Sequence, residues 1–186
     1  MLIESKKVLR EHFLRLLRNQ NAQDRLIKSR TIQEKLFERS EFETAQIILF
    51  YASFDGEVET FQMIQKATQL NKKIALPFIS KGRKEMIPTL IEDVDRLNEG
   101  LYGIKQPAET PERVVDVKDL DLVVVPGLAF DRNRHRLGRG AGYYDRFLAG
   151  LPEDTSSLGL AFDFQLVDAL PHLEAHDMTL TDVISN

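Results

Sequence analysis

Residues 121–148 have the sequence DLVVVPGLAFDRNRHRLGRGAGYYDRFL, which runs from a hydrophobic segment through a basic, glycine-containing segment into a helix-like one. Leu122–Val125 has three β-branched residues in a row and no polar residue, a pattern typical of a strand buried on both faces. Alternating glycines allow backbone N–H groups to face an anion because no Cβ is in the way. The predicted helix begins at Tyr143, and a helix N-terminus also favours negative charge. The glycines and arginines of the loop are Gly138, Gly140, Gly142, Arg132, Arg134, Arg136 and Arg139.

This pattern predicts a phosphate-binding loop, and the alternative is a glycine-rich surface turn with solvated arginines. The loop is not a P-loop because no Lys-Ser or Lys-Thr pair follows its glycines. Its spacing and its position in the chain also differ from the dinucleotide-binding fingerprint. Asp145, at the start of the predicted helix, has two interpretations. It either complements the helix dipole or binds the Mg²⁺ that a nucleoside triphosphate carries.

The composition is that of an ordinary globular protein. The chain has 186 residues, 42% of them hydrophobic and 29% charged, and we expect a single domain over residues 1–186. A formal net charge of -4 argues against a protein whose whole surface binds nucleic acid. The absence of cysteine excludes disulfides, thiolate metal sites and thiol nucleophiles. No apolar run has the length of a signal peptide or a membrane span, so we expect a cytoplasmic monomer that does not bind membranes.

Helices and strands alternate along the chain. Periodic apolar residues predict helices over residues 4–19, 22–39 and 61–70, the first with Leu9, Phe13, Leu16 and Leu17 on one face. Apolar runs predict strands over residues 45–51, 73–79, 86–91, 122–125 and 156–162, and a final edge strand over 178–184. Pro77 and Pro88 each remove a ladder donor, so one or both should lie at an edge or an end. This order predicts an α/β fold, a three-layer α/β/α sandwich with a mostly parallel central sheet, whose ligands bind beyond the carboxyl ends of the strands.

Three other clusters have ordinary structural explanations. Asp55–Thr60 is typical of a turn and an acidic helix start, which we favour over a ligand-binding role for Glu59. His172, His176 and Asp177 lack the spacing of a zinc site, and a solvated loop is favoured there. Lys6–Arg10 is typical of the solvated basic face of a helix.

Taken together, these segments resemble the 5-formyltetrahydrofolate cyclo-ligase family, also called methenyltetrahydrofolate synthetases, from Lys6 to Ile184. The most specific matches are Val125–Asp131 and Arg136–Arg146, which read VPGLAFD and RLGRGAGYYDR. The supporting matches are Lys6–Arg10, Glu57–Thr60, Gly103–Pro107 and His176–Met178.

The resemblance implies a reaction that depends on ATP and Mg²⁺. The family converts 5-formyltetrahydrofolate to 5,10-methenyltetrahydrofolate and releases ADP and phosphate. ATP would phosphorylate the formyl oxygen, and nitrogen 10 of the folate would then close the ring before phosphate departs. Such phosphoryl transfer needs positioning and charge neutralisation, and no covalent protein nucleophile is required.

The resemblance also implies roles for particular residues. The implied ATP-binding residues are Lys6, Lys7, Arg10, Arg136, Leu137, Gly138, Arg139, Gly140, Ala141, Gly142, Tyr143 and Tyr144. The implied folate-binding residues are Phe54, Glu59, Tyr102, Arg139, Gly140, Gly142 and Tyr143. Arg139 and Tyr144 match catalytic positions, and Asp145 and Asp177 match the Mg²⁺ positions.

The chain departs from the family at three positions. Ala141 stands where Gly or Lys is frequent, Tyr102 where some members have Trp, and Lys105 where Pro is frequent. Two other functions stay open: a non-catalytic folate- or nucleotide-binding protein, and a nucleic-acid-binding module that uses the loop arginines. The second lacks the interleaved aromatic residues of a stacking platform.

Overall fold

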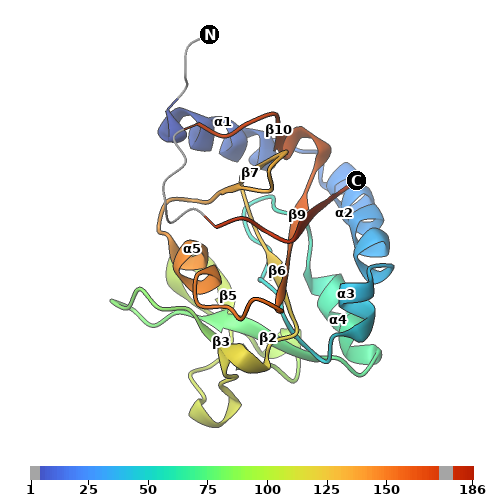
Figure 1. The fold of residues 1–186 in the computed structure, drawn as a ribbon, viewed down its shortest axis with the longest axis vertical. Coiled ribbons are helices and arrows are strands. Elements are labelled where there is room, and N and C mark those ends of the chain that lie inside the picture. Colours follow the sequence, from blue (N-terminus) through green and yellow to red (C-terminus); the bar gives the residue numbers. More distant parts are fainter. Residues whose placement is uncertain (1–4, 172–177) are drawn as a thin grey trace.

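A computed structural model describes residues 5–171 and 178–186 of the chain (Figure 1). The α-helices are α1 (Lys6–Arg18), α2 (Ala22–Phe37), α3 (Ser40–Thr44), α4 (Phe61–Gln69) and α5 (Tyr143–Leu148). The central sheet contains β1 (Ile47–Leu49), β2 (Lys73–Phe78), β3 (Ile87–Leu90), β6 (Leu122–Val125), β9 (Ser156–Ala161) and β11 (Asp182–Ser185). The shorter strands are β4 (Asn98–Glu99), β5 (Lys105–Gln106), β7 (Ala129–Asp131), β8 (Arg136–Leu137) and β10 (Leu166–Val167).

The central sheet has six strands in the order β11-β9-β6-β1-β2-β3. All neighbouring pairs are parallel except β2 and β3, which form an antiparallel hairpin. The edge strand β3 contains Pro88, which lies opposite Pro77 of β2. Pro77 lies beyond the last β2 residue that pairs with β1, so neither proline interrupts the parallel ladder. The predicted mostly parallel sheet and its proline-containing edge are confirmed.

Successive residues of the central strands point into two different hydrophobic cores. Ile48 and Val124 belong to the core on the side of α1, α2 and α4, whereas Leu49 and Val123 belong to the core on the side of α5. Figure 1 shows α2, α3 and α4 on one side of the sheet and α5 on the other. Because both faces are covered, the strands are apolar without interruption, and the predicted three-layer arrangement is confirmed.

The helix α1 buries a narrower face than the sequence predicts. Ser5 caps it by accepting a hydrogen bond from the Val8 N–H, and Phe13 and Leu17 are buried in the core. Leu16, predicted to share this face, is 37% exposed. Adjacent helical residues point about 100° apart, so a helix that contacts the core along one line buries either Leu16 or Leu17, and here it buries Leu17.

The segment after β6 differs from the predicted continuous loop. Ala129–Asp131 and Arg136–Leu137 pair as the antiparallel strands β7 and β8, and β10 extends them into a three-stranded sheet. The sequence did not reveal this hairpin because its polar residues do not alternate with apolar ones. At the C-terminal end, β11 is an edge strand as predicted, but it begins at Asp182 and not at 178. Within residues 5–171 and 178–186, no helix combines the length and apolar composition needed to cross a membrane.

Candidate active site

A cavity of about 180 Å³ opens beyond the carboxyl ends of β1, β2 and β6. Each strand contributes residues that follow it directly: Tyr51 and Ala52 after β1, Ile79 after β2, and 126–128 after β6. The remaining walls include the glycine loop (residues 136–144), the segment around β5, and the side chains of Glu57 and Met86. The cavity therefore lies at the sheet edge where a parallel α/β fold binds ligands.

The glycine loop forms one wall of the cavity and contains unsatisfied backbone donors. Gly140 and Gly142 have φ angles of 105° and 68°, in the left-handed region where most side chains are strained. No acceptor among the described residues bonds to the N–H groups of Arg139, Gly140 or Ala141. The helix α5 that follows has only six residues, so these N–H groups and the loop arginines are the main attraction for an anion.

Arg136 and Asp145 form an ion pair in the cavity wall. Arg136 Nη2 donates to Asp145 Oδ1 at 2.7 Å, and the Arg136 side chain is 4% exposed. The guanidinium also stacks 5.4 Å from the centre of the Tyr144 ring. The hydroxyl of Tyr144 is buried and has no hydrogen-bond partner in the described part of the chain. Burial, together with the nearby Glu57, raises the pKa of Tyr144, so this hydroxyl keeps its proton and can donate a hydrogen bond to a ligand.

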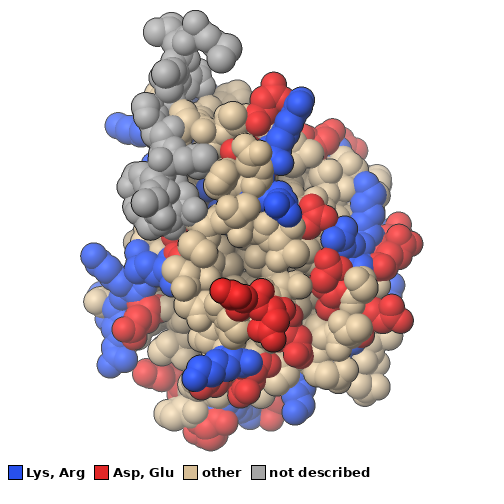
Figure 2. All heavy atoms as spheres, viewed as in Figure 1, with Lys and Arg blue, Asp and Glu red and all other residues tan. Residues whose placement is uncertain are grey.

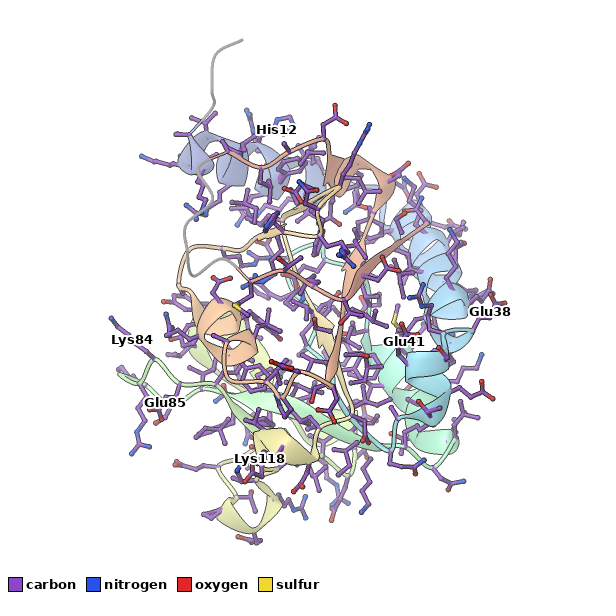
Figure 3. All side chains as sticks on the ribbon, in the orientation of Figure 1. His12, Glu38, Glu41, Lys84, Glu85 and Lys118 are labelled. Carbon is purple, nitrogen blue, oxygen red and sulfur yellow. The ribbon has the colours of Figure 1, made fainter. Side chains whose placement is uncertain are left out.

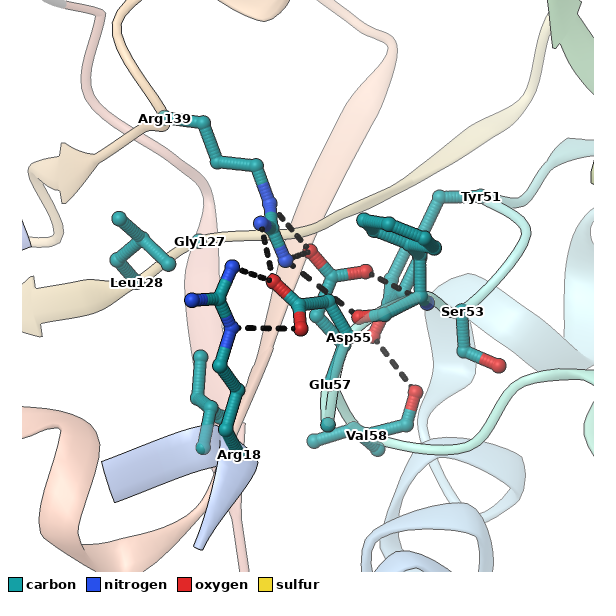
Figure 4. Close-up of polar contacts among 12 residues, drawn as sticks. Arg18, Tyr51, Ser53, Asp55, Glu57, Val58, Gly127, Leu128 and Arg139 are labelled. Atoms are coloured by element: carbon teal, nitrogen blue, oxygen red, sulfur yellow. Dashed lines mark hydrogen bonds and ion pairs between the residues drawn. The ribbon is translucent and has the colours of Figure 1, made fainter. Parts of the chain in front are cut away.

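Residues 53–60, here called the acidic turn, follow β1 and hold the side chain of Arg139. Arg139 Nε and Nη2 donate to Glu57 Oε1 at 3.1 and 3.0 Å, and Nη1 donates to Asp55 Oδ2 at 3.1 Å (Figure 4). Arg18, at the end of α1, donates to both oxygens of Asp55 at 2.8 Å. The glycine loop, the acidic turn and α1 are thereby joined by one network of ion pairs.

The two carboxylates of this network have opposite pKa shifts. A hydrogen bond from Arg18 lowers the pKa of Asp55, and Arg139 adds to that effect. Burial raises the pKa of Glu57, although Arg139 opposes the shift. Glu57 lines the cavity, so a ligand with N–H donors can reach this nearly buried carboxylate.

The residues that the sequence predicts for folate binding are only partly brought together at the cavity. Tyr102 lines it, is 76% exposed and has a φ angle of 60°. The ring centre of Phe54 lies 5.4 Å from the guanidinium of Arg139, a residue that lines the cavity. Glu59 does not line the cavity that the described residues form, and its Oε1 accepts a hydrogen bond from the Ser53 hydroxyl at 2.5 Å. The carboxylate of the acidic turn that reaches the cavity is that of Glu57.

The first helix lies against the glycine loop. Arg10 Nε donates to the Gly138 carbonyl at 3.0 Å, and a Cβ on Gly140 would lie 3.6 Å from the Arg10 guanidinium. Lys6 and Lys7 lie in the first turn of α1, with Lys6 partly buried and Lys7 exposed. The expected neighbourhood of α1 and the loop is therefore present, and phosphate binding by these cations stays a prediction.

Two of the four loop arginines are bonded away from the cavity. Arg132 pairs with Asp168 at 2.6 Å, and their side chains are 80% and 85% exposed. Arg134 Nη1 donates to the Thr181 carbonyl at 2.8 Å. The phosphate prediction therefore rests on Arg136 and Arg139 and not on all four arginines. Figure 2 shows basic and acidic side chains interspersed over the face in view.

The β2–β3 hairpin is tied to the glycine loop. Figure 3 labels Lys84 and Glu85 near the hairpin tip, away from the sheet. Arg146 of α5 donates at 3.0 Å both to the Lys84 carbonyl and to the Ala141 carbonyl. The Tyr143 hydroxyl adds a 3.4 Å bond to the Arg83 carbonyl. These bonds connect the glycine loop and the start of α5 to the hairpin.

Asp145 is compatible with the predicted binding of Mg²⁺, and Asp177 lies outside the described residues. Asp145 lines the cavity, and its side chain is 20% exposed beside Arg136. No group of three His, Asp or Glu side chains that could hold a metal occurs in the described ranges. Mg²⁺ commonly takes one or two carboxylates and completes its shell with phosphate and water oxygens. A single carboxylate beside a phosphate site fits an ion that arrives with a nucleotide.

Sequence reasoning missed Glu57 and Gln106 as cavity residues. Gln106 Oε1 accepts the Ile79 N–H at 3.3 Å, which ties β5 to the end of β2. Both residues lie within motifs that the sequence analysis noted, Glu57–Thr60 and Gly103–Pro107. A turn has no period, so the motif alone could not indicate which side chain faces the cavity.

The chain is similar to known proteins over nearly its whole length. The model of the 5-formyltetrahydrofolate cyclo-ligase family matches residues 2–186. A probable 5-formyltetrahydrofolate cyclo-ligase of Caenorhabditis elegans is 31% identical, over 97% of this chain and 92% of the relative. The 5-formyltetrahydrofolate cyclo-ligase of Mus musculus is 30% identical, over 97% of this chain and 93% of the relative.

Solved structures show the same fold. The NMR structure of 5,10-methenyltetrahydrofolate synthetase from Aquifex aeolicus has a TM-score of 0.82 and 28% identity, over 96% of this chain and 88% of that one. A 5,10-methenyltetrahydrofolate synthetase from Mycoplasma pneumoniae has a TM-score of 0.77 and 22% identity, which supports the fold alone. The chain belongs to the 5-formyltetrahydrofolate cyclo-ligase family and is a ligase.

Proposed function

We propose that this chain uses ATP and Mg²⁺ to cyclise 5-formyltetrahydrofolate to 5,10-methenyltetrahydrofolate, releasing ADP and phosphate. One observation carries the proposal: the glycine loop, with N–H groups that have no acceptor among residues 5–171 and 178–186, and the nearly buried carboxylate of Glu57 line the same cavity. A phosphate site and a site for N–H donors are thus adjacent, as a reaction between ATP and a folate requires. We expect the chain to act as a monomer and as one domain over residues 1–186.

The glycine loop binds the phosphates of ATP in this proposal. Its N–H groups that have no acceptor among the described residues donate hydrogen bonds to the phosphate oxygens, and Arg136 contributes a charge that Asp145 holds in place. Arg139 supplies a second guanidinium whose side chain is 32% exposed, so it can turn toward the phosphates without disturbing the core. Lys6, Lys7 and Arg10 add positive charge from α1.

Glu57 orients the folate ring in this proposal and takes the role that the sequence suggested for Glu59. A carboxylate in a nearly buried position gains most from paired N–H donors, which the pterin ring of a folate carries. Tyr102 supplies an exposed aromatic face beside the ring, and Tyr144 supplies a hydroxyl donor without a partner among the described residues. Phe54 supports the position of Arg139 by stacking on it.

The chemistry needs positioned groups and no covalent intermediate on the protein. The formyl oxygen attacks the terminal phosphorus of ATP, an O–P bond forms, and the bond to ADP breaks. Nitrogen 10 then attacks the activated carbon and loses its proton to a phosphate oxygen or to water. The carbon–oxygen bond breaks, and phosphate leaves with the former formyl oxygen. Arg136 and Arg139 neutralise charge on the transferred phosphoryl group, and the cavity holds the two substrates together.

Asp145 would hold Mg²⁺ together with the phosphate oxygens, with Asp177 as the second carboxylate that the resemblance suggests. The ion would offset phosphate charge when bound. Arg136 orients Asp145 by donating to its Oδ1 atom, and no donor among the described residues bonds to the second carboxylate oxygen.

The test mixes the protein, MgATP and 5-formyltetrahydrofolate and follows the near-ultraviolet absorbance of the methenyl product. We expect an absorbance rise that requires ATP, with one ADP formed for each product molecule. No rise, or a rise that is independent of ATP, would sink the proposal. Tight binding of both ligands without ADP formation would instead indicate a non-catalytic binding protein.

A further inference from the structure

The guanidinium of Arg139 is engaged by the acidic turn and not by its own loop. It donates two hydrogen bonds to Glu57 Oε1, one to Asp55 Oδ2 and a longer one of 3.4 Å to the Phe54 carbonyl (Figure 4). The Phe54 ring stacks against it. In this conformation Arg139 is hydrogen-bonded to the carboxylate of Glu57, a residue that lines the cavity.

Asp55 and Glu57 differ in the hydrogen bonds that they would keep if Arg139 moved away. Asp55 keeps the two 2.8 Å bonds from Arg18. Glu57 keeps, among the described residues, only the 3.1 Å hydrogen bond from the Phe54 N–H. Its side chain is 10% exposed, so water compensates it poorly, and burial already raises its pKa. Withdrawal of Arg139 therefore creates a nearly buried carboxylate that requires N–H donors.

Arg139 cannot serve Glu57 and a bound phosphate at the same time without sharing its donors. Its guanidinium has five N–H donors in a rigid fork, and the acidic turn engages all three of its nitrogen atoms. A polyphosphate on the glycine loop competes for this fork with several negatively charged oxygens. The side chain is partly exposed and lies between two glycines, so it can reorient while the core stays packed.

We propose that Arg139 couples the two substrates: nucleotide phosphate withdraws its guanidinium from Glu57, and the released carboxylate then binds the N–H donors of the folate ring. This inference rests on the proposed function. Nucleotide and folate binding are then positively coupled, and linkage requires the same factor in both directions. Arg18 makes the exchange possible because it keeps Asp55 neutralised when Arg139 moves.

The experiment measures the dissociation constant of 5-formyltetrahydrofolate by titration calorimetry, with and without a saturating β,γ-imido analogue of ATP and Mg²⁺. In the wild type we expect the analogue to strengthen folate binding by about fivefold or more, within the usual range of allosteric couplings. In Arg139→Ala the ratio falls to about one, and folate binding without nucleotide is tighter than in the wild type, because Glu57 is already free. Arg132→Ala, an exposed arginine of the same segment, keeps the wild-type ratio.

The outcomes separate this inference from the proposed function. If the wild type binds neither ligand, the proposed function fails. If it binds both ligands independently, the coupling is overturned while the proposed function stands. Weaker or equal folate binding by Arg139→Ala without nucleotide would also overturn the coupling, because it would mean that Arg139 does not compete for Glu57. Unchanged thermal unfolding of both variants verifies that each is folded.

Discussion

Arg136 and Asp145, which are nine residues apart, meet in the cavity wall with a nitrogen–oxygen distance of 2.7 Å. Arg136 lies in β8 and Asp145 in α5, so the ion pair closes the glycine loop between them. The side chains are 4% and 20% exposed, so solvent screens the attraction between the two charges only weakly. The pair fixes the two ends of the loop and keeps a carboxylate at the cavity.

Replacing Arg136 tests this closure. Arg136→Gln leaves Asp145 without its cation, and we expect the free energy of unfolding to fall by about 2–3 kcal/mol. Urea denaturation measures the change. Arg132→Gln is the matched control, since it breaks an exposed pair to Asp168 and should change stability by less than about 0.5 kcal/mol. Equal effects of the two substitutions would contradict a structural role of the Arg136–Asp145 pair.

Asp145→Asn tests the metal ligand. The amide keeps the size of the side chain but removes the charge that Mg²⁺ requires, so the Mg²⁺ concentration for half-maximal turnover should rise by about tenfold or more. The measurement is a Mg²⁺ titration of the cyclisation rate at saturating substrates. Asp168 is an exposed carboxylate beside Arg132, and Asp168→Asn should have the same Mg²⁺ dependence as the wild type. An unchanged dependence in Asp145→Asn would assign the ion to other groups.

The backbone of the glycine loop can be tested with two glycines of similar conformation. Gly140 and Gly82 have φ angles of 105° and 83°, and a Cβ meets ordinary contact distances at Gly140 and open space at Gly82. Gly140→Ala and Gly82→Ala should both lose about 1 kcal/mol of stability or somewhat more. Only Gly140→Ala should raise the KM for ATP, by about tenfold, because it disturbs the N–H groups of the loop. A similar KM for ATP in both variants would contradict a role of the glycine loop in nucleotide binding.

The acidic turn offers a test between two carboxylates. Glu57→Gln should raise the KM for 5-formyltetrahydrofolate by about tenfold or more, the scale of a lost charged hydrogen bond in a buried position. Glu59→Gln should change it by less than about threefold, since Glu59 accepts from Ser53 outside the cavity. Steady-state kinetics of both variants decide between them. If Glu59→Gln raised this KM more than Glu57→Gln does, Glu59 and not Glu57 would be the folate-binding carboxylate.

A pH-dependent contribution to stability lies far from the cavity. Hydrogen bonding to Arg39 lowers the pKa of Glu41 to about 2. The unfolded pKa is near 4.3, so this stabilisation is complete above that pH and is lost as the pH falls toward 2. The side chains of Arg39 and Glu41 are 36% and 20% exposed, so screening limits the contribution to about 1 kcal/mol. Between pH 7 and pH 3, Glu41→Gln should therefore lose less stability than the wild type in urea denaturation. Arg39→Gln should behave likewise, and a wild-type pH dependence in both variants would contradict the assignment.

The layers of the fold could be predicted because their signals are local. Leu122–Val125 is apolar at every position, and the strand observed there has the predicted bounds. Pro77 and Pro88 predicted that one or both of their strands lie at an edge or an end, and β3, with Pro88, lies at the sheet edge. The hairpin of β7 and β8 escaped prediction because its pairing partners, such as Phe130 and Arg136, show no shared period. The exposed Leu16 shows that an apolar residue near a helix face does not reveal how wide the contact with the core is.

By itself, the sequence determined the order of the longer helices and of the central-sheet strands, the glycine loop after β6 and the family to which these motifs point. Hydrophobic period, proline and glycine act on the nearest few residues, so these features are readable along the chain. Only the tertiary structure decided which charged groups meet. Arg139 pairs with Glu57, 82 residues away in the chain, and Arg132 pairs with Asp168 away from the cavity. It also decided that Glu57 and not Glu59 lines the cavity. Ion pairs between distant segments depend on how the sheet brings loop ends together, and no local pattern encodes that distance.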